Sequence, residues 1–193
     1  MTQGPVYLVR HGDTDWTSVD DGYFRGHGND FAPLTEAGRQ EAQVAAETLA
    51  SVGAGTLWCS PMTRALQTAA IIGVRTSLMH DVELDLREWS PSRKQQWTRA
   101  EDAVEAAREM WRHDGEWPTG ETRDWEPVSS VRRRVLSVLS RHRCEQPVIA
   151  VTHGVVIESI LGRVANTGEI CTWDWSPTWL ERWPNAASEA VDL

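Results

Sequence analysis

Apolar runs of strand length recur along the chain, and most of them end in polar or turn-forming residues. The runs at residues 6–9 and 148–151 contain the valine, leucine, isoleucine and tyrosine side chains that are typical of buried strands. Further strands are predicted at residues 56–59, near 76–80 and at 169–175. Between them, apolar residues recur at helical spacing. Strands that alternate with helices predict an α/β fold with a mainly parallel sheet.

The predicted helices have recognisable starts and ends. A first helix should begin after the cap Thr35 and end at Gly53. Ser60 and Pro61 are typical of a cap and a first helical position, and this second helix should continue to about residue 72. Helices are also predicted at residues 95–113, between residue 128 and the strand at 148–151, and after residue 153.

The 193 residues fit a single domain, residues 1–193, built as a three-layer α/β/α sandwich with helices on both faces of the sheet. Two segments interrupt the alternation of strands and helices. Residues 13–33 are polar and glycine-containing, and a loop of this length in a compact domain is usually functional. Residues 89–127 are expected to form a small helical and loop insertion over the sheet edge.

Two of the predicted strands end in a histidine followed by glycine. The first continues into Arg10, His11 and Gly12, and the strand at residues 148–151 continues into Thr152, His153 and Gly154. In an open α/β sheet, ligands bind outside the carboxyl ends of the strands. Either histidine alone would more often be structural, but two at matching positions could meet at one ligand if their strands are neighbours.

Composition limits the partners that the chain could bind. The net charge is −9, with 40% hydrophobic and 24% charged residues, which is ordinary for a globular fold. Nucleic-acid surfaces depend on clustered Lys and Arg, so a nucleic-acid partner is not expected. The arginines at 132–134 form a dense basic run, but they lie on a predicted amphipathic helix, where a solvated face is the simpler interpretation.

Cysteines, histidines and apolar stretches bear on cofactors and location. Cys59, Cys144 and Cys171 are widely spaced and odd in number, which favours reduced thiols in a cytoplasm over disulfides or a zinc site. The remaining histidines lack ligand-like spacing. No apolar stretch approaches the ~20 residues of a membrane span, and the N-terminus lacks the pattern of a signal peptide. We therefore expect no metal, no cofactor and no membrane partner; a homodimer is compatible with the sequence.

Five motifs have a familiar combination of residues. They are LVRHGDT at residues 8–14, PLTEAGRQEA at 33–42, CSPMTRALQTA at 59–69, LREW at 86–89 and VTHG at 151–154. Together they resemble the phosphoglycerate-mutase-like branch of the histidine phosphatase superfamily. The resemblance implies that His11 is a nucleophile that becomes phosphorylated, and that Arg10, Arg64, His153 and Gly154 surround the transferred phosphoryl group.

The same resemblance suggests a proton donor and shows one departure that matters. By position in its motif, Glu88 matches the glutamate that protonates the leaving group, and Asp13 is the nearest competing carboxylate. Another branch places an aspartate after the second histidine, where this chain has Gly154. Thr17 stands where relatives carry an asparagine that contacts phosphate, which could weaken the site. Glu121 lies in a near match to a Gly-Glu-Ser motif and is assigned no role.

These observations predict a metal-independent phosphatase that hydrolyses small phosphomonoesters through a phosphohistidine. A phosphoglycerate mutase, which would retain the phosphoryl group, is the alternative enzyme. A catalytically weak phosphate-binding protein is the alternative from another class, suggested by Thr17 and by a tryptophan-rich C-terminal segment. The segments at 13–33 and 89–127 should determine which ester can enter, so the substrate itself is left open.

Overall fold

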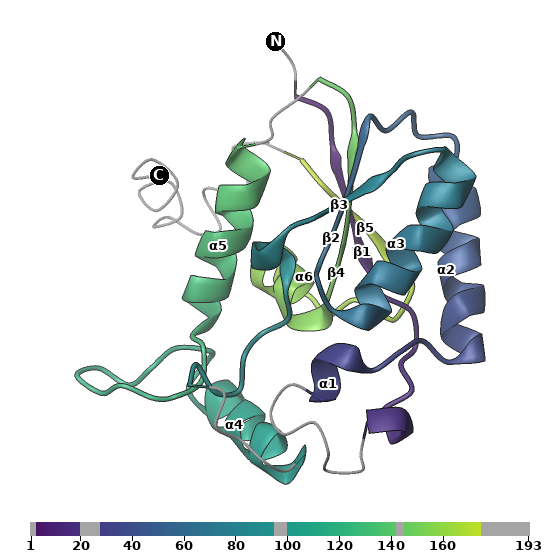
Figure 1. The fold of residues 1–193 in the computed structure, drawn as a ribbon. Coiled ribbons are helices and arrows are strands. Elements are labelled where there is room, and N and C mark those ends of the chain that lie inside the picture. The colour runs from purple at the N-terminus through teal and green to yellow at the C-terminus, as the bar shows by residue number, and fades with distance from the viewer. Residues whose placement is uncertain (1–2, 20–27, 95–99, 142–144, 175–193) are drawn as a thin grey trace.

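The computed structural model describes residues 3–19, 28–94, 100–141 and 145–174, and its centre is a five-stranded sheet (Figure 1). The strands are β1 (Val6–Arg10), β2 (Thr56–Cys59), β3 (His80–Val82), β4 (Val148–Thr152) and β5 (Ile170–Trp173). Their order across the sheet is β3-β2-β4-β1-β5. The first four are parallel, and β5 pairs antiparallel with β1 at the edge. The expected mainly parallel sheet is confirmed.

Helices cover both faces of this sheet, which confirms the three layers (Figure 1). The elements of the two outer layers are α2 (Glu36–Leu49) and α3 (Thr63–Thr76) on one face, with α5 (Val128–Arg141) and α6 (Gly154–Leu161) on the other. Alternate strand residues feed two separate cores: Leu8 and Ala150 pack with α5 and α6, whereas Val9 and Val151 pack with α2 and α3. Fully buried parallel strands of this kind read as continuous apolar runs.

Helix α3 is displaced from its predicted bounds. Ser60 does not cap it: the cap position is Met62, with extended backbone, and the helix begins two residues after Pro61. At its other end α3 continues to Thr76 and stops where Ser77 adopts the left-handed conformation (φ 59°). The third strand therefore starts at His80, later than predicted. For α2 the Thr35 cap is confirmed, since its hydroxyl accepts the Gly38 amide, but the helix ends at Leu49.

The connecting segments gather beyond the carboxyl ends of the parallel strands. Here lie the short helices η1 (Thr17–Val19) and α1 (Gly28–Phe31), and also α4 (Ala100–Arg112), at the lower end of Figure 1. Within the segment predicted as an insertion, Met110 and Trp125 are buried and join the core beneath α5. Residues 95–99 of the predicted helix at 95–113 lie outside the described residues.

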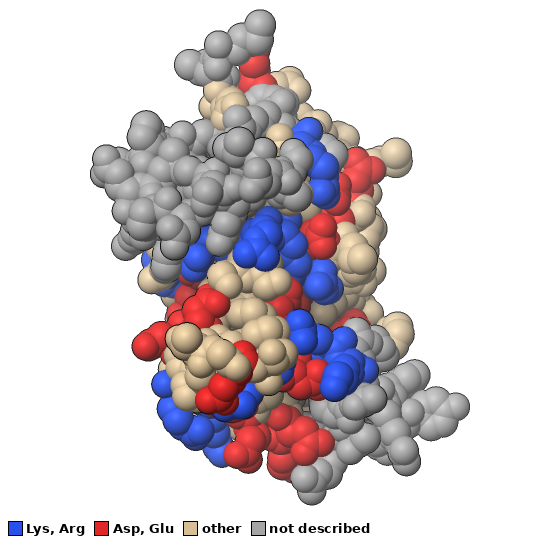
Figure 2. Space-filling view, turned by 90° about the vertical axis from the view of Figure 1, so that its left-hand side faces the viewer, with Lys and Arg blue, Asp and Glu red and all other residues tan. Residues whose placement is uncertain are grey.

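Three expectations about surfaces and termini can be compared with the structure. On the face that α5 lines, basic and acidic side chains are interspersed rather than gathered into a basic patch (Figure 2). No described helix is both long and apolar enough to cross a membrane. Of the C-terminal tryptophans, Trp173 is buried at the end of β5, and Trp175, Trp179 and Trp183 lie outside the described residues.

Candidate active site

The two predicted histidines meet at the carboxyl edge of the sheet. In the parallel pair β1 and β4, Arg10 lies opposite Thr152, so the residue after each strand is a histidine at the same level. The His11 amide donates to the Thr152 carbonyl at 3.0 Å. The imidazole centroids of His11 and His153 are 5.0 Å apart, with the rings at 61°. The strand register therefore produces the convergence that the sequence suggested.

Hydrogen bonds fix the tautomer of His11. Its Nδ1 lies 2.8 Å from the Gly12 carbonyl oxygen, which can only accept, so Nδ1 carries the proton. The Nε2 atom is left with a lone pair and accepts a hydrogen bond from Arg64 Nε at 3.1 Å. Burial, then the charges of Arg64 and Arg10, lower the pKa of His11 to about 3. His11 is therefore a neutral imidazole with its unprotonated nitrogen facing the arginine.

The loop after β1 is held in place by a close backbone contact with α2. A side chain at Gly12 would bring its Cβ to 2.2 Å from the Gly38 carbonyl oxygen, and one at Gly38 would meet the Asp13 carbonyl at 2.1 Å. Only glycine permits this approach. The Gly12 amide also donates to the Thr68 hydroxyl of α3. These contacts set the direction in which the His11 ring points.

Two arginines flank the histidines. Arg64, in the first turn of α3, is buried; its Nη1 donates to the Asn29 carbonyl, and its guanidinium carbon lies 5.2 Å from the ring centre of Trp16. Arg10 extends over Gly154, and it donates from Nη1 to the Ala165 carbonyl at 2.6 Å. Arg10 Nε is buried and has no hydrogen-bond partner among the described residues. It offers a donor to an anion at this point.

His153 is fully buried and bonded to Ser60, the residue after β2. Its Nε2 lies 2.7 Å from the Ser60 hydroxyl oxygen, and that oxygen also accepts the Met62 amide at 3.3 Å. The Ser60 hydroxyl can donate to Nε2, and in that tautomer the imidazole proton lies on Nδ1. Nδ1 is buried and lacks a partner among the residues that the structure describes. Burial, followed by the charges of Arg64 and other groups, lowers the pKa of His153 well below its ordinary value.

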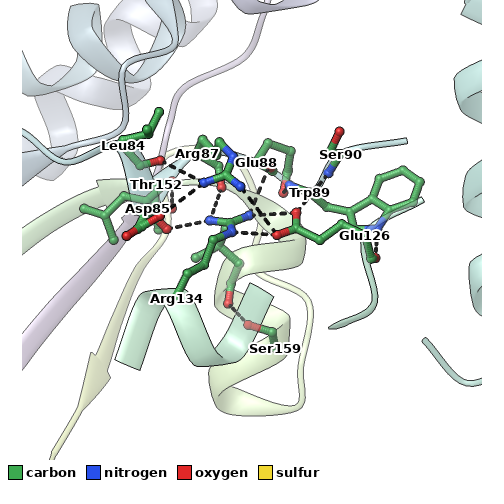
Figure 3. A network of polar contacts seen from close by, with 12 residues as sticks. Leu84, Asp85, Arg87, Glu88, Trp89, Ser90, Glu126, Arg134, Thr152 and Ser159 are labelled. Atoms are coloured by element: carbon green, nitrogen blue, oxygen red, sulfur yellow. Dashed lines mark hydrogen bonds and ion pairs between the residues drawn. The ribbon is translucent and has the colours of Figure 1, made fainter. Parts of the chain in front are cut away.

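Glu88 lies in the segment after the short helix η2 (Leu84–Leu86), near Thr152 at the end of β4 (Figure 3). The Thr152 hydroxyl donates to the Leu86 carbonyl at 2.8 Å, which ties this segment to the end of β4. One carboxylate oxygen of Glu88 accepts the Trp89 amide at 2.8 Å. Burial raises the pKa of Glu88 even though the Trp89 amide and the Arg64 charge act in the opposite direction. The Arg64 and Glu88 charges thus lie close enough to affect each other.

This arrangement of two histidines, two arginines and a glutamate can be compared with known proteins. The sequence profile of the Histidine phosphatase superfamily (branch 1) matches residues 6–178. The chain belongs to this superfamily. It is 31% identical over 172 residues to a probable phosphoglycerate mutase GpmB of Erwinia tasmaniensis, which covers 83% of this chain and 76% of that protein. The predicted family membership is confirmed.

Solved structures of similar proteins agree with the fold. A protein named mycobacterial hydrolase 2 superposes with a TM-score of 0.66 at 27% identity, covering 92% of this chain and 85% of that one. A mycobacterial glucosyl-3-phosphoglycerate phosphatase solved in complex with VO3 gives a TM-score of 0.64 at 26% identity, covering 88% and 90% of the two chains. The neighbours of this histidine phosphatase superfamily member thus include phosphatases as well as proteins named mutases.

Three residues considered from the sequence lie away from the histidine pair. Asp13 accepts the Thr35 hydroxyl at 2.8 Å, so its carboxylate is engaged at the start of α2. Thr17 is exposed, and its hydroxyl donates to Asp15 at 2.6 Å rather than pointing to the histidines. Glu121 is exposed and pairs with Arg123. The structure thus bonds the Asp13 carboxylate to Thr35, the cap residue of α2, and gives neither Thr17 nor Glu121 a contact with the site.

Three other residues near the site were missed by the sequence reasoning. Glu126 and Arg134 form a buried ion pair next to the Glu88 segment, although Arg134 belongs to an arginine run interpreted as a solvated face. Trp16 lies beside Arg64 at the mouth of the site. Helical phase was the available signal for Arg134, because it lies one residue before Val135 and three after Val131, both of which are fully buried.

Metal binding can be assessed for the described part of the chain. There, no three His, Cys, Asp or Glu side chains are grouped so that they could hold a metal ion. Cys59 and Cys171 are buried free thiols, and burial raises the pKa of Cys59 to about 12. The charges of Arg64 and Arg10 act directly on His11 in this site.

Proposed function

We propose that the protein is a phosphatase that hydrolyses small phosphomonoesters through a phosphohistidine at His11. The observation that carries the proposal is the state of the His11 imidazole. Its Nε2 lone pair is unprotonated and faces the buried guanidinium of Arg64. Arg10 Nε and His153 Nδ1 add two buried donors that lack a partner among the described residues. A nucleophile surrounded by such donors suits a phosphoryl group.

In the first step, Nε2 of His11 forms a bond to phosphorus while the bond to the ester oxygen breaks and its electron pair stays on that oxygen. Protonated Glu88 supplies the proton that turns this oxygen into an alcohol. The raised pKa of Glu88 favours the protonated form that this step requires. Arg64 Nε–H, which now bonds Nε2, would turn to a phosphate oxygen, and Arg10 would bind another.

In the second step, water attacks the phosphorus of the phosphohistidine. The phosphorus–nitrogen bond breaks, and its electron pair returns to Nε2 of His11. Glu88, now a carboxylate, takes the proton of the attacking water and becomes protonated again. Inorganic phosphate leaves, and both residues regain their starting states.

A phosphoglycerate mutase is the second candidate, because curated relatives carry that name. A mutase must shield the phosphohistidine from water until the product has reoriented, which requires long covering segments. We propose that the insertion at 89–127 shapes access to the site without sealing it from water. A weak phosphate-binding protein is less well supported, since the arginines, histidines and Glu88 are all present.

The test is the fate of the phosphoryl group. We expect phosphate release from several phosphomonoesters, an acid-labile phosphorylated intermediate that His11→Ala cannot form, no requirement for bisphosphoglycerate and little interconversion of 2- and 3-phosphoglycerate. Efficient interconversion with negligible phosphate release would make the protein a mutase. Unchanged phosphate release in His11→Ala would overturn the mechanism, and binding of phosphate without turnover would favour the weak phosphate-binding protein.

A further inference from the structure

We infer that the buried pair Arg134 and Glu126 positions Glu88 for proton transfer, by holding the backbone on both sides of it. This inference rests on the proposed function, because it takes Glu88 as the proton donor. Neither residue touches the histidines in the contacts described above; both act through the segment at residues 85–90. Their side chains are only 9% and 6% exposed, so the pair lies within the protein and not on a solvated helix face.

Every N–H group of the Arg134 guanidinium has an acceptor next to Glu88 (Figure 3). Nε donates to Glu126 Oε1 at 2.8 Å, and Nη2 donates to Glu126 Oε2 at 3.1 Å. Nη1 donates to the carbonyls of Asp85 and Arg87, and Nη2 also donates to the carbonyl of Glu88 at 3.2 Å. Five donors in a planar fork thus bind one carboxylate and three backbone carbonyls of the segment.

Glu126 holds the other side of Glu88. Its Oε2 accepts the Ser90 amide at 3.2 Å, and its own amide donates to the Ser90 carbonyl at 2.9 Å. Its carbonyl accepts the indole N–H of Trp89 at 2.6 Å. On one side of Glu88, Arg134 binds the backbone carbonyls of Asp85 and Arg87. On the other side, Glu126 binds Trp89 and Ser90. The described backbone at residues 87–90 belongs to no helix or strand, so these contacts replace regular hydrogen bonding.

The position of the Glu88 carboxyl group is the quantity that this pair should control. A general acid acts only within hydrogen-bond reach of the leaving oxygen, and a displacement of 1 Å can reduce a rate by about 100-fold. The guanidinium has a second effect through its charge, because Arg134 lowers the pKa of both Glu88 and His153, although burial has the larger effect on each. Arg134 thus acts on both the position and the protonation of the acid.

The experiment separates these two effects with matched variants. Arg134→Lys keeps the charge and loses the fork, Arg134→Met loses both, and Glu126→Gln keeps the shape of the carboxylate with half of its acceptors. Arg133→Met, on the same helix at an exposed position, is the control. Each variant is compared with the unmodified protein on an alkyl phosphate, whose leaving oxygen needs a proton, and on p-nitrophenyl phosphate, whose leaving oxygen hardly needs one.

Arg134→Lys should slow the alkyl phosphate by roughly 10- to 100-fold and p-nitrophenyl phosphate by about threefold or less. Glu126→Gln should also slow the alkyl phosphate more than p-nitrophenyl phosphate, but by a smaller factor than Arg134→Lys. Arg133→Met should slow neither ester selectively. Arg134→Met should in addition move the basic limb of the kcat/KM profile to higher pH, because removal of a nearby positive charge raises the pKa of Glu88. Equal losses on both esters in soluble, folded variants would indicate a merely structural pair and would overturn the inference.

A readout that does not need turnover keeps this result separate from the proposed function. Carbon NMR of the Glu88 carboxyl group, assigned with Glu88→Gln, should show a higher pKa in Arg134→Met and an altered shift in Arg134→Lys. If the unmodified protein releases no phosphate from any ester, the proposed function fails, and the titration still decides the inference. An unchanged Glu88 signal in both variants would refute it whatever the activity.

Discussion

The hydrogen bond between Ser60 and His153 makes a prediction about the tautomer of a buried imidazole. With the Ser60 proton donated to Nε2, His153 should carry its proton on Nδ1 and offer it to a phosphate oxygen. Ser60→Ala removes that donor and leaves Nε2 buried without a partner. The imidazole proton can then move to Nε2, which withdraws the Nδ1 donor from the anion.

The size of the effect follows from the burial of both groups. Ser60 and His153 are both 0% exposed, so water cannot replace the lost bond. A hydrogen bond to a charged group contributes about 1.5–3 kcal/mol, and about 1.4 kcal/mol is a factor of ten. We therefore expect kcat/KM for phosphomonoesters to fall by roughly 10- to 100-fold in Ser60→Ala. The unsatisfied nitrogen should also cost about 1–3 kcal/mol of stability.

The assay is long-range proton–nitrogen NMR of the histidine rings, which distinguishes the two neutral tautomers, together with steady-state kinetics. Ser159→Ala is the matched control, because this fully buried serine donates to the Val156 carbonyl within α6. It should lose stability without changing the ring spectrum of His153. If Ser60→Ala keeps the Nδ1–H tautomer and the full rate, the serine does not set the proton position and the reasoning is wrong.

Three further changes test other parts of the site. Glu88→Gln should slow alkyl phosphates far more than p-nitrophenyl phosphate, whereas Asp13→Asn, at the α2 cap, should lack that selectivity; the reverse pattern in initial rates would move the acid role to Asp13. Thr17→Asn should keep activity, because Thr17 is exposed and bonds Asp15 rather than the site, and a severe loss in initial rates would reveal a separate role for Thr17. His11 alone should lower the unfolding free energy by about 1.4 kcal/mol per pH unit below 6.5, toward its pKa of about 3, because the unfolded histidine binds a proton that folded His11 does not. Denaturant titrations should therefore show a shallower slope for His11→Gln than for the unmodified protein, and equal slopes would contradict this.

The sequence predicted the part of the site that depends on strands. Apolar runs located β1 and β4, and parallel strands of one sheet present their carboxyl ends at one edge, so His11 and His153 could be placed together before any contact was known. The bounds of α3 were harder to predict from the sequence. Ser60 and Pro61 have the preferences of a helix start, but the Ser60 hydroxyl bonds His153, and the helix begins after Met62. The contact with His153, which is distant in the sequence, determines the role of Ser60.

The residues that bind the Glu88 segment could not be predicted from local sequence patterns. Gly120, Glu121 and Thr122 resemble a known motif more closely than the residues around Glu126 do, yet Glu121 is exposed and Glu126 is buried. The path of the backbone through residues 89–127 decides which glutamate contacts the Glu88 segment. The spacing of residues along the sequence does not predict that path. For Arg134 helical phase was an available signal, because it lies next to Val135 and three residues after Val131, but the phase does not show which carboxylate it binds.

The proposed mechanism requires a nucleophile without its proton and an acid with its proton at the same pH, and burial favours both states. The ordinary pKa is 6.5 for the imidazole of His11 and 4.5 for the carboxyl of Glu88, so in water the acid would ionise first. Burial disfavours the charged form of each group, which lowers the first pKa and raises the second. The Arg64 charge adds to the lowering of the His11 pKa. At Glu88 it acts against burial, because a nearby cation favours the carboxylate and so lowers its pKa. The proposed proton donor therefore needs a position where burial raises its pKa more than the arginine charges lower it. Glu88, whose backbone carbonyl binds Arg134, meets that requirement, whereas the Asp13 carboxylate already accepts a hydrogen bond from Thr35.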